Sequence, residues 1–304
     1  MTAVTEFILL GFQVSQNIRI LMFSLLIVIY WFTMFMNLLI ITLVSTSKIL
    51  HTPMYFFISQ LSITDILLST DIVPNLLHIL LYNRGAITFI GCMTQFYFFS
   101  ASEASECLFL TLMSYDRYVA ICNPLRYASI MTSTYCVILV TICWLAAFSI
   151  TMSEIITILR LNFCGPNIID HFFCDFMPIL KLSCSDTNHI QLQDSLLGIP
   201  LTLFPIIIIM FSYTRIIVTI LRIPSSTGRQ KAFSTCSSHL IVVSIFYWTI
   251  FSVYFIPTRG ESSTISKILS LLYTVFTPLI NPIIYSLKNK DLKKAFHGHI
   301  YRRL

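Results

Sequence analysis

Long stretches without a charged side chain dominate the hydrophobic pattern of this chain. Five of these stretches cover residues 20–47, 127–153, 195–214, 232–258 and 268–287. Each reaches the roughly 20 residues that a helix needs to cross the hydrocarbon core of a bilayer. Two further stretches, 52–80 and 91–122, are also apolar overall but contain acidic residues. Because these runs are continuous rather than alternating, they predict seven membrane-spanning helices and argue against a β-barrel.

The predicted fold is all-α: a single seven-transmembrane helix bundle over residues 1–304, with its N-terminus on the extracellular side. The expected spans are residues 20–47, 54–80, 91–122, 134–159, 192–221, 231–257 and 266–287. Most connections between spans are short, but residues 160–191 form a long extracellular loop. A loop of this length is usually either functional or disordered, and its cysteines favour an ordered one.

The cytoplasmic tail, residues 288–304, carries a helical pattern. Its apolar residues Leu292, Phe296 and Ile300 recur at every fourth position among basic residues. This spacing places them on one face of a helix and is typical of a helix on a membrane surface. We therefore expect a short amphipathic helix after the seventh span.

Composition and charge agree with a membrane protein. Hydrophobic residues make up 56% of the chain and charged residues only 11%, whereas a soluble domain carries about 25% charged residues. With the N-terminus outside, thirteen of the 19 Lys and Arg residues fall on the cytoplasmic side, as the positive-inside rule requires. The net charge of +6 then indicates contact with anionic membrane lipid. It does not indicate nucleic-acid binding, because no soluble element presents a basic face.

The nine cysteines divide by this topology. Four lie outside or at the outer edge of the membrane, namely Cys92, Cys164, Cys174 and Cys184. An even number in an oxidising compartment favours two disulfides, and the residues alone leave all three connectivities open. The other five lie in spans or near the cytosol, where free thiols are expected.

Motifs with candidate chemistry lie near the cytoplasmic ends of the spans. The third span ends in MSYDRYVAICNPLRY (113–127), where an Asp–Arg pair is also compatible with a helix end that reaches headgroup water. The seventh contains TPLINPIIY (277–285), whose prolines free backbone carbonyls that neighbouring groups must satisfy. An enzyme is not indicated, because the chain has no nucleophile–His–acid arrangement, HExxH motif or phosphate-binding glycine loop.

Four of these stretches carry a resemblance to a known family. LHTPMYFFISQLS, MSYDRYVAIC, KAFSTCSSHL and NPIIYSLKN resemble, in order and spacing, the odorant receptor family within the rhodopsin-like G-protein-coupled receptors. The resemblance covers essentially the whole chain. It implies that a small odorant binds in the outer half of the bundle and moves the sixth helix outward. A stimulatory olfactory-type heterotrimeric G protein would then bind and raise cyclic AMP. The expected location is the plasma membrane, in the cilia of olfactory sensory neurons.

The resemblance also implies roles for individual residues. The activation switch would consist of Asp116, Arg117, Tyr118, Tyr213, Asn281, Pro282 and Tyr285. Asp116 and Arg117 are expected to form a latch in the inactive state, which loosens so that Arg117 faces the G protein. Tyr213 and Tyr285 would support the open state, and Tyr247 would transmit the effect of ligand contact to the sixth helix. The implied disulfides are Cys92–Cys174, between the third helix and the long loop, and Cys164–Cys184 within that loop.

Glu106 lies in the middle of the third span. It precedes Arg117 by eleven residues, which places it about 20° from the same face and roughly 16 Å deeper in the membrane. Asp65 lies eleven residues after Met54 and reaches a matching depth. Two acids at one depth suggest a shared site for a proton or a cation. The resemblance implies a sodium-type site of Asp65, Glu106 and Asn281, and no other cofactor. The alternative is a protonated Glu106 that is hydrogen-bonded within the bundle.

Glu103 lies about one turn nearer the outside than Glu106 and faces another direction. We expect it to line a ligand cavity together with Phe99, Ser100, Ala104, Tyr247, Phe251, Tyr254 and Thr274. A mainly aromatic and aliphatic lining fits a small, partly apolar ligand. An ionised Glu103 would favour an amine, whereas a protonated one would donate to a carbonyl or alcohol. The competing interpretation is a structural hydrogen bond, for example to Ser100.

Two other functions stay open from the residues alone. A transporter or channel would use Asp65, Glu103 and Glu106 as an ion path, but the internal repeats typical of transporters are not evident. A rhodopsin-like receptor for a small ligand outside olfaction is the second alternative.

Overall fold

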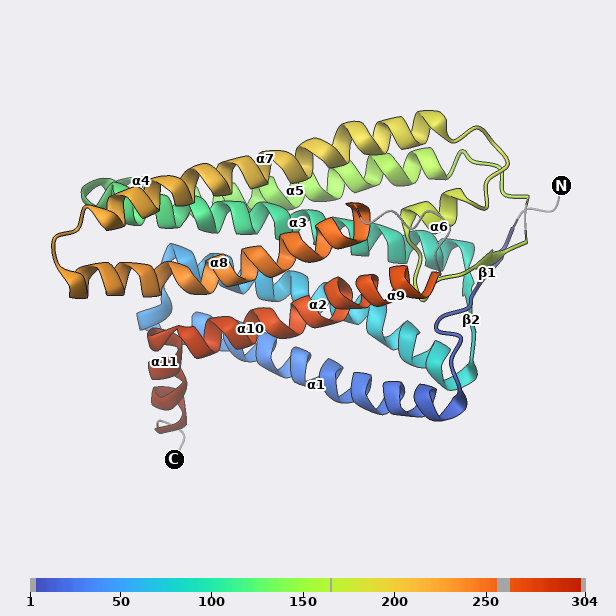
Figure 1. The fold of residues 1–304 in the computed structure, drawn as a ribbon, viewed down its shortest axis with the longest axis horizontal. Helices are drawn as coiled ribbons and strands as arrows, with labels where there is room; N and C mark the ends of the chain where they lie inside the picture. Colours follow the sequence, from blue (N-terminus) through green and yellow to red (C-terminus); the bar gives the residue numbers. More distant parts are fainter. Residues whose placement is uncertain (1–3, 165, 256–262, 302–304) are drawn as a thin grey trace.

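Long helices lie side by side in one elongated bundle (Figure 1). The computed structural model describes residues 4–164, 166–255 and 263–301. Six membrane passages are single helices: α1 (Gln16–Thr46), α2 (Pro53–Tyr82), α3 (Phe89–Cys122), α5 (Ser133–Ile158), α7 (Asn188–Leu221) and α8 (Ser226–Phe255). The seventh consists of α9 (Ser263–Leu271), a π-helical segment (Leu272–Phe276) and α10 (Thr277–Lys288). The prediction of a seven-helix bundle is confirmed.

Local sequence signals fix where several helices begin and end. The Thr88 hydroxyl accepts a hydrogen bond from the Gly91 backbone N–H at 3.0 Å and so caps α3. Pro53 occupies the first turn of α2, where its missing N–H costs nothing. The same helix ends at Asn83, whose φ of 68° is the left-handed conformation that Asn tolerates better than most residues.

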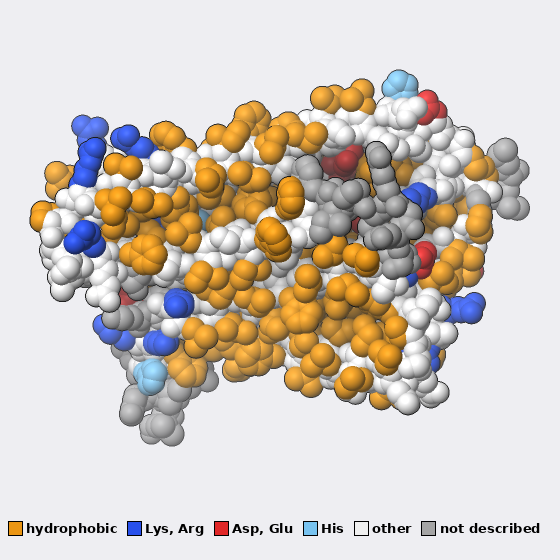
Figure 2. Space-filling model, viewed as in Figure 1, with side chains coloured by type: hydrophobic (Ala, Val, Ile, Leu, Met, Phe, Trp, Pro, Cys, Tyr) orange, Lys and Arg blue, Asp and Glu red, His pale blue; other side chains and the backbone are white. Residues whose placement is uncertain are grey.

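The outer surface of the bundle is apolar, as contact with lipid requires. Figure 2 shows hydrophobic side chains over its long side, with Lys and Arg gathered near the ends. Trp31 on α1, for example, is 67% exposed. Six helical segments in the described part of the chain are long and apolar enough to span a membrane: α1, α2, α5, α7, α8 and the combined passage of α9 and α10. The central α3 is not among them because it carries more charge. It packs against α2, α5, α7 and α8.

A small sheet covers the outer end of the bundle, and sequence analysis did not predict it. The central strand β1 (Glu6–Leu9) pairs antiparallel with β2 (Gly85–Thr88) and parallel with β3 (Ile168–Ile169). Phe7 and Leu9, two residues apart on one face of β1, are fully buried. The sheet therefore holds the N-terminal segment against the long extracellular loop.

Covalent and ionic links reinforce this outer layer. Cys92 at the start of α3 is bonded to Cys174, and Cys164 is bonded to Cys184. These are the two pairs that the resemblance implied. Lys267 of α9 is buried, and its ammonium donates to the Gly11 carbonyl at 2.8 Å. It also pairs with the Asp170 carboxylate at 2.5 Å. The N-terminal segment, the loop and α9 are thus joined.

At the cytoplasmic end the connections are short and helical. Two short helices, η2 (Pro124–Arg126) and α4 (Tyr127–Ile130), join α3 to α5. The expected tail helix is present as α11 (Lys290–Tyr301), which turns away from α10 (Figure 1). Leu292 packs inward and Phe296 is 39% exposed, while the side chain of Ile300 lies outside the described residues. That α11 lies on the membrane surface stays a prediction.

The hydrophobic core is divided by depth. One cluster of buried residues fills the cytoplasmic half and includes Leu61 of α2; another fills the outer half and includes Leu68 of the same helix. Asp65 lies between them and is 1% exposed. The division leaves a buried polar layer near the middle of the bundle.

Candidate functional site

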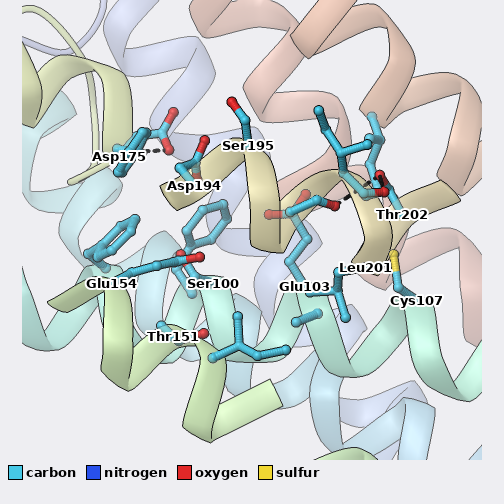
Figure 3. A pocket seen from close by; sticks show the side chains of 18 residues that line it. Ser100, Glu103, Cys107, Thr151, Glu154, Asp175, Asp194, Ser195, Leu201 and Thr202 are labelled. Atoms are coloured by element: carbon cyan, nitrogen blue, oxygen red, sulfur yellow. Dashed lines mark hydrogen bonds between the residues drawn. The ribbon is translucent and has the colours of Figure 1, made fainter. Parts of the chain in front are cut away.

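A cavity of about 270 Å³ lies in the outer half of the bundle, between α3, α5, α7 and the short helix α6 (Phe176–Leu180). Four residues that sequence analysis placed in a ligand cavity line it: Phe99, Ser100, Glu103 and Ala104. All four lie on α3. Figure 3 shows Glu103 extending from this helix into the cavity. The third helix therefore forms one wall, as predicted.

The opposite wall differs from the prediction. Tyr247, Phe251 and Thr274 do not line the cavity, and the side chain of Tyr254 lies outside the described residues. Helix α8 is turned so that Ile250 faces the cavity, and Phe251, about 100° further round, is 52% exposed. Thr274 is fully buried, and its hydroxyl donates to the Ser270 carbonyl at 2.8 Å. Helices α5 and α7 supply the wall instead.

Three acidic residues of this wall were missed by sequence analysis. They are Glu154 on α5, Asp175 at the start of α6, and Asp194 on α7. Glu154 and Asp194 lie inside the expected spans 134–159 and 192–221, and neither was considered as a site residue. A signal was available for these two, because an ionisable residue inside a span is unusual, whereas Asp175 lies in the long loop 160–191.

Asp175 is held at the cavity by its neighbours in the chain. Cys174 is bonded to Cys92 of α3, and its backbone N–H donates to the Gln95 side-chain oxygen at 3.0 Å. The Asp175 carboxylate accepts a hydrogen bond from the Phe176 N–H at 2.8 Å and so caps α6. Burial raises the pKa of Asp175 to about 6 despite this hydrogen bond, and the charge of Asp194 adds to the rise.

Asp65, Glu106 and Asn281 meet in the polar layer near the middle of the bundle. The Asn281 side-chain amide donates to Asp65 at 3.1 Å and to Glu106 at 3.0 Å. All three residues are buried, at 1–2% exposure. The depth matched from helix geometry thus corresponds to a real cluster. Binding of an ion at this cluster stays a prediction.

Pro282 has a specific structural consequence next to this cluster. A proline lacks the N–H that would bond to the carbonyl four residues earlier, here that of Pro278. The side-chain amide of Asn37 on α1 donates to that carbonyl at 3.2 Å instead. This contact ties α1 to α10 at the point where the helix is interrupted.

The two residues of the predicted latch are in contact at the cytoplasmic end of α3, and their role as a latch stays a prediction. Arg117 and Asp116 make an ion pair, in which the guanidinium Nε donates to the carboxylate at 2.8 Å. The Tyr127 hydroxyl of α4 donates to the other carboxylate oxygen at 2.8 Å. Asp116 is fully buried, so these partners satisfy a carboxylate that has no access to water. Tyr127 was not singled out in the sequence, although it closes the motif that was quoted.

A second hydrogen-bonded chain joins three helices. The Tyr213 hydroxyl of α7 lies 2.5 Å from His239 Nδ1 of α8, and His239 Nε2 lies 3.1 Å from the Leu110 carbonyl of α3. Because a carbonyl only accepts, Nε2 carries the proton, and Nδ1 accepts from the tyrosine. Sequence analysis missed His239, although it lies within the quoted stretch KAFSTCSSHL.

A larger cavity of about 800 Å³ opens at the cytoplasmic end, and Arg117 lines it. Tyr285 of α10 also lines it and is almost fully buried. Lys288, Lys294 and Asp291 line it as well, so basic residues outnumber acidic ones in this lining. Tyr118 does not line this cavity; it is half-buried beside Phe211 of α7, with ring centroids 6.4 Å apart.

Comparison with known proteins gives a consistent result. The family model for olfactory receptors matches residues 26–302. The chain is 47% identical over 303 residues to human (Homo sapiens) "Olfactory receptor 10A7", covering 100% of this chain and 96% of that protein. It is 44% identical over 299 residues to mouse (Mus musculus) "Olfactory receptor 6B9", covering 98% and 95% respectively.

Proposed function

The chain belongs to the olfactory receptor family of rhodopsin-like G-protein-coupled receptors, and we propose that it detects small organic odorants and activates a stimulatory olfactory-type G protein. It is a multi-pass membrane protein and a signalling receptor rather than an enzyme. Activation of that G protein raises cyclic AMP. The proposed location is the plasma membrane of olfactory cilia.

The observation that carries this proposal is that one helix lines both cavities. Glu103 of α3 lines the outer cavity, and Arg117 of the same helix lines the cytoplasmic one. Fourteen residues separate them, or roughly 21 Å along the helix axis. A ligand that favours one packing of α3 against its neighbours thereby biases the cytoplasmic end.

The cytoplasmic contacts suggest what must change on activation. His239 holds α8 to α7 through Tyr213 and to α3 through the Leu110 carbonyl. An outward movement of α8 breaks these hydrogen bonds, each worth about 1 kcal/mol. Release of Arg117 from Asp116 would then expose its guanidinium to the G protein, with Tyr213 and Tyr285 free to support the open cavity.

We also propose that a sodium ion acts as an allosteric ligand beside Asp65, Glu106 and Asn281. The Asp65 and Glu106 carboxylates share one amide donor, so their oxygen atoms can accept further contacts. Hard cations such as sodium prefer oxygen ligands. A cation there would stabilise the inactive packing and oppose the odorant.

A cyclic AMP reporter in cells, combined with surface labelling, tests the proposed function. A chemically broad panel of odorants is expected to contain agonists, and Arg117→Ala is expected to abolish their signal at normal surface density. Arg84→Ala, which changes an exposed arginine on the outer side, is the matched control and should signal normally. Silence towards the whole panel despite surface expression would refute the proposal. Signalling that survives Arg117→Ala would refute the latch.

A further inference from the structure

The outer cavity has an unusual charge balance. Four carboxylates line it, from Glu103, Glu154, Asp175 and Asp194. They belong to α3, α5, the long loop and α7, and Figure 3 shows their side chains projecting toward the same space. Among the residues that the structure describes, no Lys, Arg or His lines it. The described part of the fold therefore brings four acids together at one cavity without a basic side chain in the lining.

These carboxylates are close enough to interact but have few internal partners. Glu103 lies near enough to Asp175, Glu106, Glu154 and Asp194 to experience repulsion from their negative charges. Among the described residues, only Asp175 has a hydrogen-bond donor, the Phe176 N–H. Glu103 lies deep in the bundle and makes no hydrogen bond or ion pair with a described residue, and its accessible part faces the cavity. Burial of unpaired carboxylates is costly, so the cavity favours a positively charged occupant.

The spacing of the acids argues against a metal ion. In the part of the chain that the structure describes, no three His, Cys, Asp or Glu side chains converge closely enough to hold one. The acids are instead spread along the cavity. Phe96 of α3 packs on Phe176, the neighbour of Asp175, at a ring separation of 6.3 Å. Glu103 lies two turns deeper on the same helix, which is roughly 10 Å.

The surface between the two ends is mainly apolar, although Ser100, Thr151, Ser195 and Thr202 also line the cavity. Phe99 of α3 and Ile199 of α7 line the cavity there, and Ile250 of α8 and Cys107 lie near Glu103 at the inner end. A hydrocarbon chain would bury its methylene groups on this surface, each worth about 0.8 kcal/mol. The cavity thus combines acidic ends with an apolar middle.

We propose that the ligands of this receptor are aliphatic diamines, with one ammonium group bound by Glu103 at the inner end and the other by Asp175 at the outer end. Asp194 and Glu154 add negative charge at the outer end. This inference rests on the proposed function, because it names the ligand class of the same cavity. Ammonium groups are donors only, and they match carboxylates that lack internal donors.

The test uses cells that carry the full-length receptor and a cyclic AMP reporter. Straight-chain diamines are compared with monoamines, alcohols and carboxylic acids of matched length. Diamines are expected to act at concentrations about ten- to hundredfold lower than monoamines, since a hydrogen bond to a charged group is worth that factor. Alcohols and carboxylic acids should be weaker still. Equal potency of diamines and alcohols would overturn the proposal.

Charge-removing variants locate the two ammonium groups. Glu103→Gln and Asp175→Asn keep the side-chain shape, and each is expected to lower diamine potency to about that of the monoamine. Asp71→Asn is the matched control, because Asp71 lies on α2 within the bundle but does not line the cavity. Potency unchanged in both Glu103→Gln and Asp175→Asn, at normal surface density, would overturn the assignment.

The Tm of the purified receptor reports ligand binding independently of signalling. A diamine should raise the Tm of the wild-type receptor and of Asp71→Asn, but much less that of Glu103→Gln, since only a bound ligand stabilises the fold. Stabilisation without a cyclic AMP response would support the ligand class and refute the proposed function. A response to neutral odorants, with no diamine effect on Tm, would overturn the ligand class and leave the proposed function intact.

Discussion

Glu103 and Glu106 lie three residues apart on α3, yet their carboxylates have different surroundings. Glu106 accepts a hydrogen bond from Asn281 and shares this donor with Asp65. Glu103 faces a cavity and has no hydrogen-bond donor among the described residues. Three residues correspond to about 300° of rotation and 4.5 Å of rise, so neighbours in sequence meet different helices. The role of a buried acid can therefore be inferred only together with the hydrogen-bond donors around it.

The same difference separates the two halves of the bundle. Toward the cytoplasm, Asp116 is satisfied by Arg117 and Tyr127. In the outer cavity, Glu154 and Asp194 have no such partner among the described residues. Internal partners stabilise one conformation of the switch, whereas unpaired groups leave binding capacity to a ligand. The comparison predicts that substitutions in the first group cost stability and that substitutions in the second cost ligand response.

The largest expected effect follows from Asn281→Ala. This change removes the donor shared by Asp65 and Glu106 and leaves two buried carboxylates without their amide partner. Each unsatisfied group costs about 1–3 kcal/mol, so we expect a strong loss of thermal stability and of surface receptor. Glu103→Gln, the control from the outer cavity, should keep the wild-type Tm without ligand. A loss of stability in Glu103→Gln as large as in Asn281→Ala would contradict the comparison.

Features fixed by local pattern could be predicted from the sequence. The spans follow from the length of the apolar stretches, and the matched depth of Asp65 and Glu106 follows from the regular rise of a helix. Asp65 and Glu106 accordingly lie together at one depth, while Asn281 beside them and the Asp116–Arg117 pair lie where the resemblance implied. These features depend on one helix at a time or on a motif that spans a few residues.

Features fixed by packing between helices could not be predicted. A rotation of α8 by one residue decides whether Ile250 or Phe251 faces the cavity, and apolar sequence on all sides gives no preference. The strands around Phe7 are too short to show a reliable alternation. Glu154 and Asp194 lie inside the expected spans 134–159 and 192–221, but the sequence does not show which way their side chains face. Their joint position emerges only from the contact of α5 with α7 and α3.

A smaller effect is expected from Glu106→Gln in the polar layer. The glutamine keeps an acceptor for Asn281 but removes the negative charge that a sodium ion requires, so folding should be preserved. If sodium stabilises the inactive state of the wild-type receptor, basal cyclic AMP should fall as sodium rises, and the variant should lose most of this dependence. The measurement is basal signal in sodium buffer against a matched choline buffer. An unchanged sodium response in Glu106→Gln would refute the ion site.

The smallest expected effect is a pH dependence of diamine potency. The pKa of Asp175 is raised to about 6, so its charge is present above that pH and is lost as the pH falls through it. Among the described residues, the other titratable carboxyl groups that line the cavity are those of Asp194, Glu103 and Glu154, so their own protonation acts in the same direction. Lowering the external pH from about 7.5 to about 5.5 should protonate most of the Asp175 population and reduce diamine potency several-fold.

The control for this pH effect is Asp175→Asn, which has no charge to lose at that position. Its diamine potency is expected to be lower at neutral pH and to change less between the two pH values, with the remaining change due to the other three acids. A direct activator of adenylyl cyclase, applied at both pH values, corrects for any effect on the reporter. If diamine potency rises on acidification, the outer ammonium group does not bind a carboxylate, and the two-ended site is wrong. If wild type and Asp175→Asn change equally, the outer contact belongs to Asp194 or Glu154 rather than to Asp175.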